Sequence, residues 1–274
     1  MESVVELIRR AETSLPKDVE SAIEKAYKRE KDEIPRMQLK TILENVKIAR
    51  KKKIPICQDT GLLGFFVRIG SNSDISAITI KRGIIKGVKI ATEEIPLRPN
   101  TVHPITRKNS NDNTGILIPE IEFEFSDRDY TEITVMPKGA GSENMTRLGM
   151  LNPSEGIKGV KRFVIETVAE AKGNPCPPTI VGVGIGGSSD LAIKLAKRSL
   201  LREIGKKGKN GRIMRLENEL LDEINRLGIG PMGLGGKTTS LAVNIEIAHC
   251  HTASLPVAVN LGCWANRRAS VRIG

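Results

Sequence analysis

The chain of 274 residues is 39% hydrophobic and 27% charged, which is typical of a soluble protein, and its apolar runs fall far short of a membrane helix of ~20 residues. A chain of this length can bury a core without disulfide staples. The net charge of +11 is compatible with a nucleic-acid partner, but aromatic residues are only 3% and basic residues are spread along helical segments, so we expect none.

The first 50 residues are predicted to be helical, because apolar residues recur at helical spacing in two segments. These residues are Val19, Ile23 and Tyr27, then Leu39, Ile42, Leu43, Val46 and Ala49. The charged, amphipathic start MESVVELIRRAE is unlike a signal peptide, so we expect a cytoplasmic protein. A strand is predicted at 62–69, and a helix at about 74–94.

A long polar loop at 97–115 follows, and loops of that length inside a compact domain are usually functional or mobile. Alternating apolar residues then predict a hairpin of two strands, 121–125 and 130–136. The remaining predicted elements are helices at 153–172, 188–205 and 213–227, and strands at 179–185, 241–249 and 256–261. We therefore predict one α/β domain over residues 1–274, with mixed α+β layers: a helical N-terminus and then a mixed sheet with packed helices.

Two glycine-rich motifs suggest nucleotide binding, and both lack a required part. The run Gly182–Gly187 fits GxGxxG between a strand and a helix, but no acidic residue ends a second strand ~20 residues later. Gly236-Lys237-Thr238 resembles the end of a P-loop, but the position of the first glycine is Pro231. A tight strand-to-helix turn, or an anion site at the helix start, fits the first run better. A structural glycine loop, with or without an anion contact, fits the second.

The four cysteines contain no CxxC pair, so they predict neither a disulfide framework nor a compact zinc knuckle. They could be core residues, metal ligands or nucleophiles. His249, Cys250 and His251 lie together in the sequence, but their spacing is a weak zinc pattern. Within a strand the two histidines would share one face, and a lone histidine is more often structural than catalytic.

Several separated loops together resemble one family. They are KKKIPICQDTG (51–61), LRPN…NDNTG (97–115), PKGAGSEN (137–144), the Cys176 loop with GVGIGGSSD, and GPMGLGGKTT…HTASLPVAVNLGCWANRR (231–268). In that order they are similar to the N-terminal half of class I (iron–sulfur) fumarases and the related tartrate dehydratases, over nearly the whole chain.

The resemblance implies a [4Fe-4S] cluster held by Cys57, Cys176 and Cys263, each from a distant loop. Clusters normally take four thiolates, so three would leave one iron open to act as a Lewis acid on the substrate. Prolines on both sides would stiffen the Cys176 loop, and Gly262, which precedes Cys263, would allow a close backbone approach. Cys250 matches no ligand, so we interpret it as a core cysteine.

The resemblance also assigns roles in hydrating fumarate to malate. Asp59 would transfer the proton and His251 would assist it or hold a water molecule, which are the catalytic roles. Gln58 would face the substrate, Arg98 would clamp a carboxylate bidentately, and Gly141 would offer a backbone N–H. Ordinary alternatives are a turn residue for Asp59 and a surface salt bridge for Arg98. Arg267 and Arg268 are further anion contacts to consider.

Single-chain members of this family carry a second domain, which is missing here. The length therefore fits an alpha subunit that is inactive without a separate beta subunit, expected as α2β2, and that acts on a small dicarboxylate in the tricarboxylic acid cycle. Alternatives within the family are L(+)-tartrate dehydratase and mesaconate hydratase. A distant alternative is a non-catalytic basic protein that binds nucleic acid.

Overall fold

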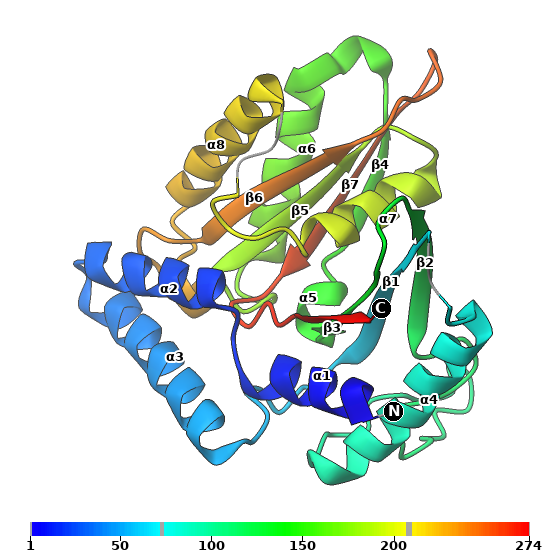
Figure 1. The fold of residues 1–274 in the computed structure, drawn as a ribbon. Coiled ribbons are helices and arrows are strands. Elements are labelled where there is room, and N and C mark those ends of the chain that lie inside the picture. The colour runs from blue at the N-terminus through cyan, green and yellow to red at the C-terminus, as the bar shows by residue number, and fades with distance from the viewer. Residues whose placement is uncertain (1, 72–73, 207–209, 274) are drawn as a thin grey trace. The chain divides into compact units, whose positions relative to one another are not determined.

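The structure is a computed structural model that describes residues 2–71, 74–206 and 210–273. The chain divides into two compact units, each with its own four-stranded sheet (Figure 1). Unit 1 comprises residues 1–16, 45–140 and 267–274, and unit 2 comprises residues 17–44 and 141–266. Helices combined with mixed sheets confirm the predicted α/β class. That residues 1–274 behave as one domain stays a prediction.

The helices are α1 (Glu2–Thr13), α2 (Lys17–Arg29), α3 (Glu33–Lys52), α4 (Ala77–Glu94), α5 (Ala140–Glu143), α6 (Gly156–Ala171), α7 (Ser189–Ser199) and α8 (Gly211–Arg226). The strands are β1 (Leu62–Gly70), β2 (Glu120–Ser126), β3 (Thr131–Lys138), β4 (Arg147–Leu151), β5 (Thr179–Ile185), β6 (Ser240–Ile247), β7 (Leu255–Gly262) and β8 (Ala269–Ile273). The helical N-terminus is confirmed, and Val19, Ile23, Leu39 and Val46 are fully buried as their spacing predicts.

The sheet of unit 1 has the strand order β2-β1-β3-β8, so the predicted hairpin of β2 with β3 is wrong. Strand β1 lies between them, parallel to β2 and antiparallel to β3. The link after β2 crosses the end of β1 at Gly70, where an added Cβ would lie 2.5 Å from the carbonyl oxygen of Tyr130. Because Gly70 has no side chain, the short link can pass over β1 and place β3 on its far side.

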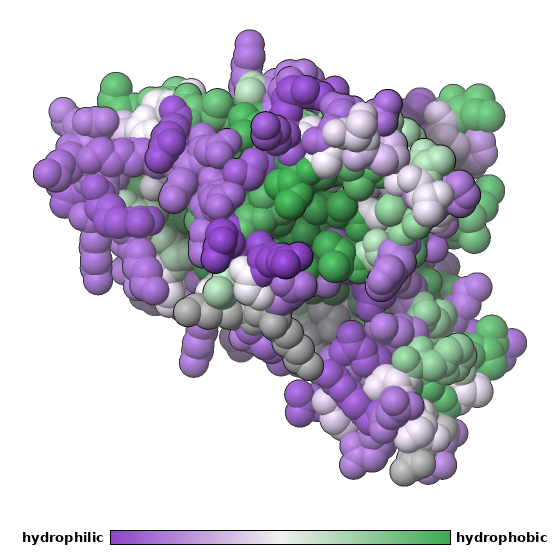
Figure 2. All heavy atoms as spheres, turned by 90° about the horizontal axis from the view of Figure 1, so that it is seen from above, coloured by the Kyte–Doolittle hydropathy of each residue, from purple (hydrophilic) through white to green (hydrophobic). Residues whose placement is uncertain are grey.

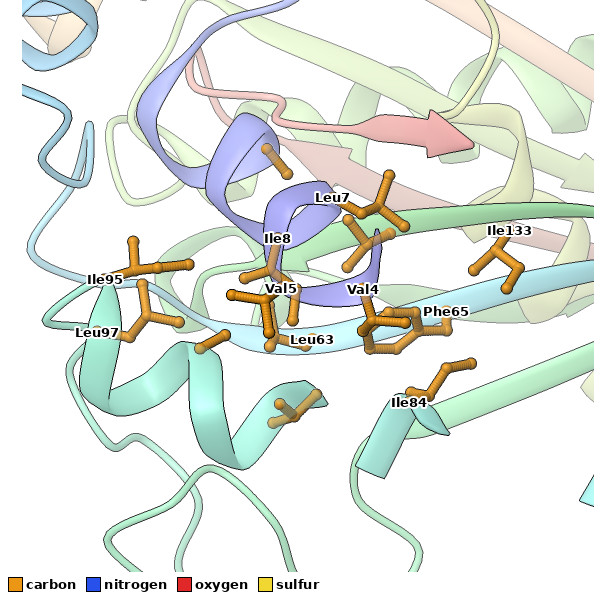
Figure 3. Close-up of a cluster of buried hydrophobic side chains, with 14 of the residues drawn as sticks. Val4, Val5, Leu7, Ile8, Leu63, Phe65, Ile84, Ile95, Leu97 and Ile133 are labelled. Atoms are coloured by element: carbon orange, nitrogen blue, oxygen red, sulfur yellow. The ribbon is translucent and has the colours of Figure 1, made fainter. Parts of the chain in front are cut away.

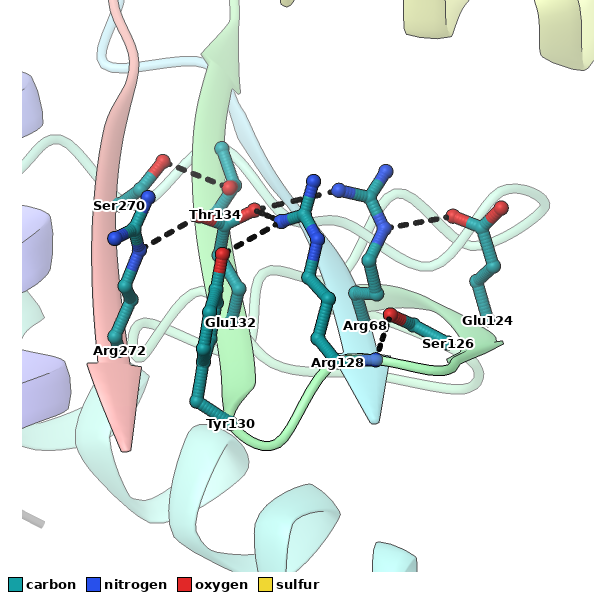
Figure 4. Close-up of polar contacts among 9 residues, drawn as sticks. All are labelled: Arg68, Glu124, Ser126, Arg128, Tyr130, Glu132, Thr134, Ser270 and Arg272. Carbon is teal, nitrogen blue, oxygen red and sulfur yellow. Dashed lines mark hydrogen bonds and ion pairs between the residues drawn. The ribbon is translucent and has the colours of Figure 1, made fainter. Parts of the chain in front are cut away.

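The two faces of this sheet differ in polarity. One face packs against α1 and α4, where Phe65, Ile84 and Ile133 are among the buried side chains (Figure 3). The other face carries an ion-pair network in which Glu132 accepts from Arg68, Arg128 and Arg272 over 3.4–3.5 Å (Figure 4). This alternation follows from the period of two along a strand.

The sheet of unit 2 has the order β4-β7-β5-β6, with β5 parallel to β6 and antiparallel to β7. Val181 and Val183 of β5 pack with α6 and α8 on one face. On the other face Gly182 and Gly184 lie under α7, and an added Cβ at Gly184 would sit 2.0 Å from the carbonyl oxygen of Ala192. The GxGxxG run therefore serves close helix–sheet packing, followed by a turn at Gly186 and Gly187, both with positive φ.

Two predicted element ends are corrected. Helix α7 ends at Ser199 rather than near 205, and β6 ends at Ile247, so residues 248–254 form a loop. The short strands β4 and β8 were not predicted, because a five-residue strand carries little periodic signal.

Hydrophilic side chains cover most of the face seen in Figure 2, with apolar residues exposed among them, as on most folded proteins. Among the described residues, none of the helices combines the length and the apolar character that crossing a membrane would take.

Candidate active site

The Asp59 carboxylate in unit 1 is held by three N–H donors. Its Oδ1 accepts from the backbone N of Gly61 at 2.9 Å and from Nδ2 of Asn100 at 3.1 Å. Its Oδ2 accepts from the backbone N of Ala140 at 2.8 Å. The carboxylate lies so close to the backbone at residue 139 that a glycine is needed there, since an added Cβ would meet Oδ2 of Asp59 at 2.9 Å. A carboxylate offers about four lone-pair sites, so the side chain is fixed in direction and still has room for one more donor.

The polar loop 97–115 is organised by one buried side chain, Asn113. Its Oδ1 accepts from the backbone N of Asn100 at 2.7 Å, and its Nδ2 donates to the carbonyl oxygen of Arg98 at 3.2 Å. The same carbonyl accepts from the Thr60 hydroxyl at 2.8 Å. These bonds fix the backbone of Arg98 and Asn100 beside the segment that carries Asp59.

The side chains of Gln58 and Arg98 are exposed, and that of Cys57 is partly exposed. Among the described residues, Arg98 forms no ion pair, so its guanidinium is available to an anion. Unit 1 therefore brings together four of the predicted site residues: Cys57, Gln58, Asp59 and Arg98.

Arg267 is not an anion contact of the kind the sequence suggested, because its side chain is only 2% exposed. It pairs with Glu12, which is 0% exposed, at 2.5 Å between Nη1 and Oε2. Burial raises the pKa of Glu12 to about 7, although the charge and hydrogen bond of Arg267 act in the opposite direction. Sequence analysis missed Glu12, since nothing in the pattern of α1 separates it from a surface glutamate.

Cys176 and Cys263 lie on neighbouring loops of unit 2. The backbone N of Trp264 donates to the carbonyl oxygen of Cys176 at 3.1 Å, which joins the two loops. Cys176 has a φ of 55°, a conformation that is strained for any residue except glycine and is common at functional sites. At Gly262 an added Cβ would meet Oδ1 of Asn266 at 2.8 Å, so the Asn266 side chain packs closely against this glycine, and a close backbone approach at Cys263 stays a prediction.

The loop 248–254 changes the interpretation of its histidines and of Cys250. Because β6 ends at Ile247, strand alternation does not apply to His249 and His251. Cys250 is exposed and its thiol donates to the carbonyl oxygen of Ser254 at 3.2 Å, so the prediction of a core cysteine is wrong. His251 is exposed, and its Nδ1 accepts from the backbone N of Ala253 at 3.1 Å, which leaves the proton of a neutral ring on Nε2.

The second glycine loop is also structural. The backbone N of Lys237 donates to Oε2 of the buried Glu30 at 2.7 Å, so a carboxylate of the chain fills the place an anion would take.

Gly141 of α5 is exposed, and an added Cβ there would lie 3.0 Å from the carbonyl oxygen of Asn174.

The proposed cluster ligands are divided between the units, Cys57 in unit 1 and the other two in unit 2. Among the described residues, no group of three His, Cys, Asp or Glu side chains stands ready to hold a metal ion. The donor set itself fits an iron–sulfur cluster: none of the described cysteines is in a disulfide, the three proposed ligands are partly exposed, and thiolate is the ligand such clusters use.

Comparison with known proteins gives a consistent result. Residues 1–272 match the family model described as fumarate hydratase (Fumerase). A protein of Methanocaldococcus jannaschii with the provisional name L(+)-tartrate dehydratase subunit alpha is 56% identical, over 98% of this chain and 96% of its own length.

Two further relatives differ in length. The L(+)-tartrate dehydratase subunit alpha of Escherichia coli K12 is 36% identical, over 95% of this chain and 86% of its own length. A protein of Geobacillus stearothermophilus, provisionally named class I fumarate hydratase, is 38% identical over 99% of this chain, which spans only 54% of that relative.

Proposed function

Because the chain belongs to the fumarate hydratase (Fumerase) family, whose named relatives are hydro-lyases, we propose that it is the alpha subunit of a [4Fe-4S]-dependent hydro-lyase acting on a small dicarboxylate. The observation that carries the proposal is the Asp59 carboxylate, fixed by three donors two residues from the proposed ligand Cys57. A fixed, partly exposed carboxylate beside a metal ligand is suited to move a proton on a bound substrate.

Cys57, Cys176 and Cys263 would hold the cluster in this proposal. When bound, the cluster supplies a Lewis acid, because three protein thiolates leave one iron open to a substrate hydroxyl or carboxylate. Two of the three ligand loops are already joined by the hydrogen bond between Trp264 and Cys176.

The chain's own residues would bind the dicarboxylate and move its proton. Asp59 has one lone-pair direction left, from which it would exchange a proton with the substrate carbon. The exposed guanidinium of Arg98 would grip a carboxylate through two parallel N–H donors, and Gln58 would add a neutral contact. Gly141 would offer its backbone N–H, and His251 would donate from Nε2 or hold a water molecule.

We propose fumarate and malate as the substrate pair, as expected from the sequence. L(+)-tartrate is the second candidate, and the names of the relatives from Methanocaldococcus jannaschii and Escherichia coli favour it. Mesaconate is a third substrate of the same chemical class. The pocket groups that separate these acids would come partly from the second subunit.

A separate beta subunit would complete the enzyme, with α2β2 as the proposed stoichiometry. Relatives of matching length are named alpha subunits, which implies a partner. The longer relative named class I fumarate hydratase would contain the equivalent of both chains. A cytoplasmic location belongs to the same proposal.

The cluster is tested by colour. Anaerobically reconstituted chain should absorb visible light and bleach in air, since an open iron is sensitive to oxygen. Cys57→Ser, Cys176→Ser and Cys263→Ser should each abolish the absorbance, whereas the matched control Cys250→Ser should keep it. Loss of colour in the control alone, or its retention in all three ligand variants, would contradict the ligand assignment.

Activity is tested on the chain reconstituted with its beta subunit. Hydration of fumarate and dehydration of malate, L(+)-tartrate and methylmalate are compared over a range of substrate concentrations, and the highest kcat/KM identifies the substrate. Asp59→Asn should lower kcat by about 100-fold or more if Asp59 transfers the proton. Wild-type kcat in this variant would remove Asp59 from the chemistry, and full activity of the lone chain would remove the need for a partner.

A further inference from the structure

Arg267 and Glu12 contact both ends of the segment that carries Cys57 and Asp59. At one end, the backbone N of Ile56 donates to the carbonyl oxygen of Glu12 at 2.8 Å. At the other end, Nη2 of Arg267 donates to the carbonyl oxygen of Asp59 at 3.0 Å. The ion pair between Glu12 and Arg267 closes the ring, so residues 56–59 are held at their first N–H and their last C=O.

All these groups belong to unit 1 and come from distant parts of the sequence. Glu12 lies near the end of α1, and Arg267 lies just before β8. The segment itself links α3 to β1, and Asn45 of α3 adds a bond from Nδ2 to the carbonyl oxygen of Ile56 at 2.9 Å. A short link without secondary structure of its own is thereby fixed from several directions.

Stability alone explains this pair poorly. Both side chains are almost fully buried, and a buried ion pair is often no more stabilising than apolar residues of the same volume. Oε1 of Glu12 is also buried without a hydrogen-bond partner among the described residues, which costs folding free energy. What the geometry shows instead is orientation, because the planar guanidinium of Arg267 holds a carboxylate and a backbone carbonyl at fixed angles to each other.

We propose that Glu12 and Arg267 are positioning residues, which hold residues 56–59 so that Cys57 and Asp59 keep the geometry that the cluster and the substrate need. This inference rests on the proposed function for the roles of those two residues. Groups that orient metal ligands typically change metal affinity or activity by about 10–100-fold when they are replaced. We expect Arg267→Met and Glu12→Gln to act within that range.

A matched pair in unit 2 provides the control. Arg202 and Glu217 also form a largely enclosed ion pair, at 16% and 10% exposure. Oε1 of Glu217 likewise accepts from a backbone N–H, that of Ile245, at 2.8 Å. Arg202→Met and Glu217→Gln therefore remove a comparable pair that contacts neither Cys57 nor Asp59.

The experiment measures three quantities on all four variants and on the wild type: unfolding temperature, alkylation rate of Cys57 in the cluster-free chain, and kcat per bound cluster in the reconstituted complex. Cys57 is followed in a background where the other three cysteines are Ser. We expect Arg267→Met and Glu12→Gln to raise the alkylation rate and to lower kcat by about ten-fold each. Arg202→Met and Glu217→Gln should lower the unfolding temperature by a similar amount and change neither rate more than two-fold.

Equal alkylation rates and equal kcat per cluster in the two pairs of variants would overturn the proposal, leaving the buried pair a structural one. Glu12→Gln keeps size and an acceptor oxygen, so it gives a result even if Arg267→Met does not fold. Arg267→Lys should lie between Arg267→Met and the wild type in kcat and in alkylation rate, because its ammonium can reach one of the two acceptors. If the wild-type chain takes up no cluster, the proposed function fails, while the alkylation rates still decide whether the pair holds the segment.

Discussion

The side-chain amide of Asn100 donates a hydrogen bond to Oδ1 of Asp59 over 3.1 Å, and it also lies 3.3 Å from the Thr60 hydroxyl. Two loops that the sequence separates by some forty residues are therefore joined through the carboxylate that we assign to proton transfer. Asn100 follows Arg98 by two positions, so the bond also restrains the backbone from which the proposed carboxylate-binding side chain of Arg98 extends. Loss of this one amide should loosen both groups.

Asn100→Ala should lower kcat by about ten-fold while it reduces the free energy of unfolding by only about 1 kcal/mol, the usual value of one hydrogen bond. Asn210→Ala is the control, because Asn210 caps α8 through its bond to the backbone N of Arg212 at 2.9 Å, and a lost cap has a similar cost. Steady-state kinetics and urea unfolding of both variants check the prediction. Equal kcat in the two would mean that Asn100 is only structural.

Asn113→Ala should reduce the free energy of unfolding more than Asn100→Ala does. The buried amide serves three partners, since it accepts from the N of Asn100 and donates to the carbonyl oxygen of Arg98 and, at 3.2 Å, to the hydroxyl of Thr92. Leaving these groups unsatisfied should reduce the free energy of unfolding by about 2–3 kcal/mol. KM for the substrate should rise more than kcat falls, because the loss displaces the backbone of Arg98. An unchanged KM would contradict the role given to that loop.

Sequence patterns predicted most of the helices and strands, and the family resemblance grouped the loops that carry the proposed site. Helical spacing in two segments indicated a helical N-terminus, and alternation located β2 and β3, because burial of one face imposes a period. The CQDTG, LRPN and NDNTG segments were singled out as one site, and unit 1 does place Asp59, Arg98 and Asn113 in one hydrogen-bonded group.

Pairing and burial were harder to predict, because they depend on residues far apart in the sequence. Alternation gives a strand's faces but not its neighbour, so the insertion of β1 between β2 and β3 was missed. Glu12 and Arg267 are 255 residues apart and each looks like a surface charge, so no local pattern reveals their buried pair. Cys250 was placed in the core because it matches no ligand of the family, but β6 ends at Ile247 and the cysteine lies exposed in the loop that follows.

The GxGxxG run gives a prediction about packing. Gly184→Ala should reduce the free energy of unfolding by about 3 kcal/mol, since the new methyl group would lie 2.0 Å from the carbonyl oxygen of Ala192 and α7 would have to move. Gly211→Ala at the start of α8 meets nothing within 4 Å and should stabilise the chain by up to about 1 kcal/mol. Urea unfolding distinguishes the two. NAD should change neither unfolding curve, and a clear stabilisation by NAD would revive the nucleotide-binding alternative.

Glu12 gives the stability a predictable dependence on pH. Its pKa is raised from 4.5 to about 7 in the folded chain, chiefly because burial penalises the charged form. An unfolded chain then releases this proton at lower pH than the folded chain does. The contribution of Glu12 to stability is therefore fully present below about pH 4.5 and is lost as the pH rises to about 7.

Glu12→Gln removes this titration and keeps the shape of the side chain, so the difference between wild type and variant isolates it. The free energy of unfolding of the wild type, minus that of Glu12→Gln, should be largest near the acid end of the measurable range and should fall steadily until about pH 7. Above that pH it should level off, because Glu12 is then ionised in both states. Urea unfolding at half-unit pH intervals measures the difference. A difference that is flat with pH would mean that Arg267 offsets the effect of burial and that the pKa of Glu12 is the same in the folded and unfolded chains, and a difference that rises with pH through the acid range would mean that the ion pair outweighs burial and lowers that pKa.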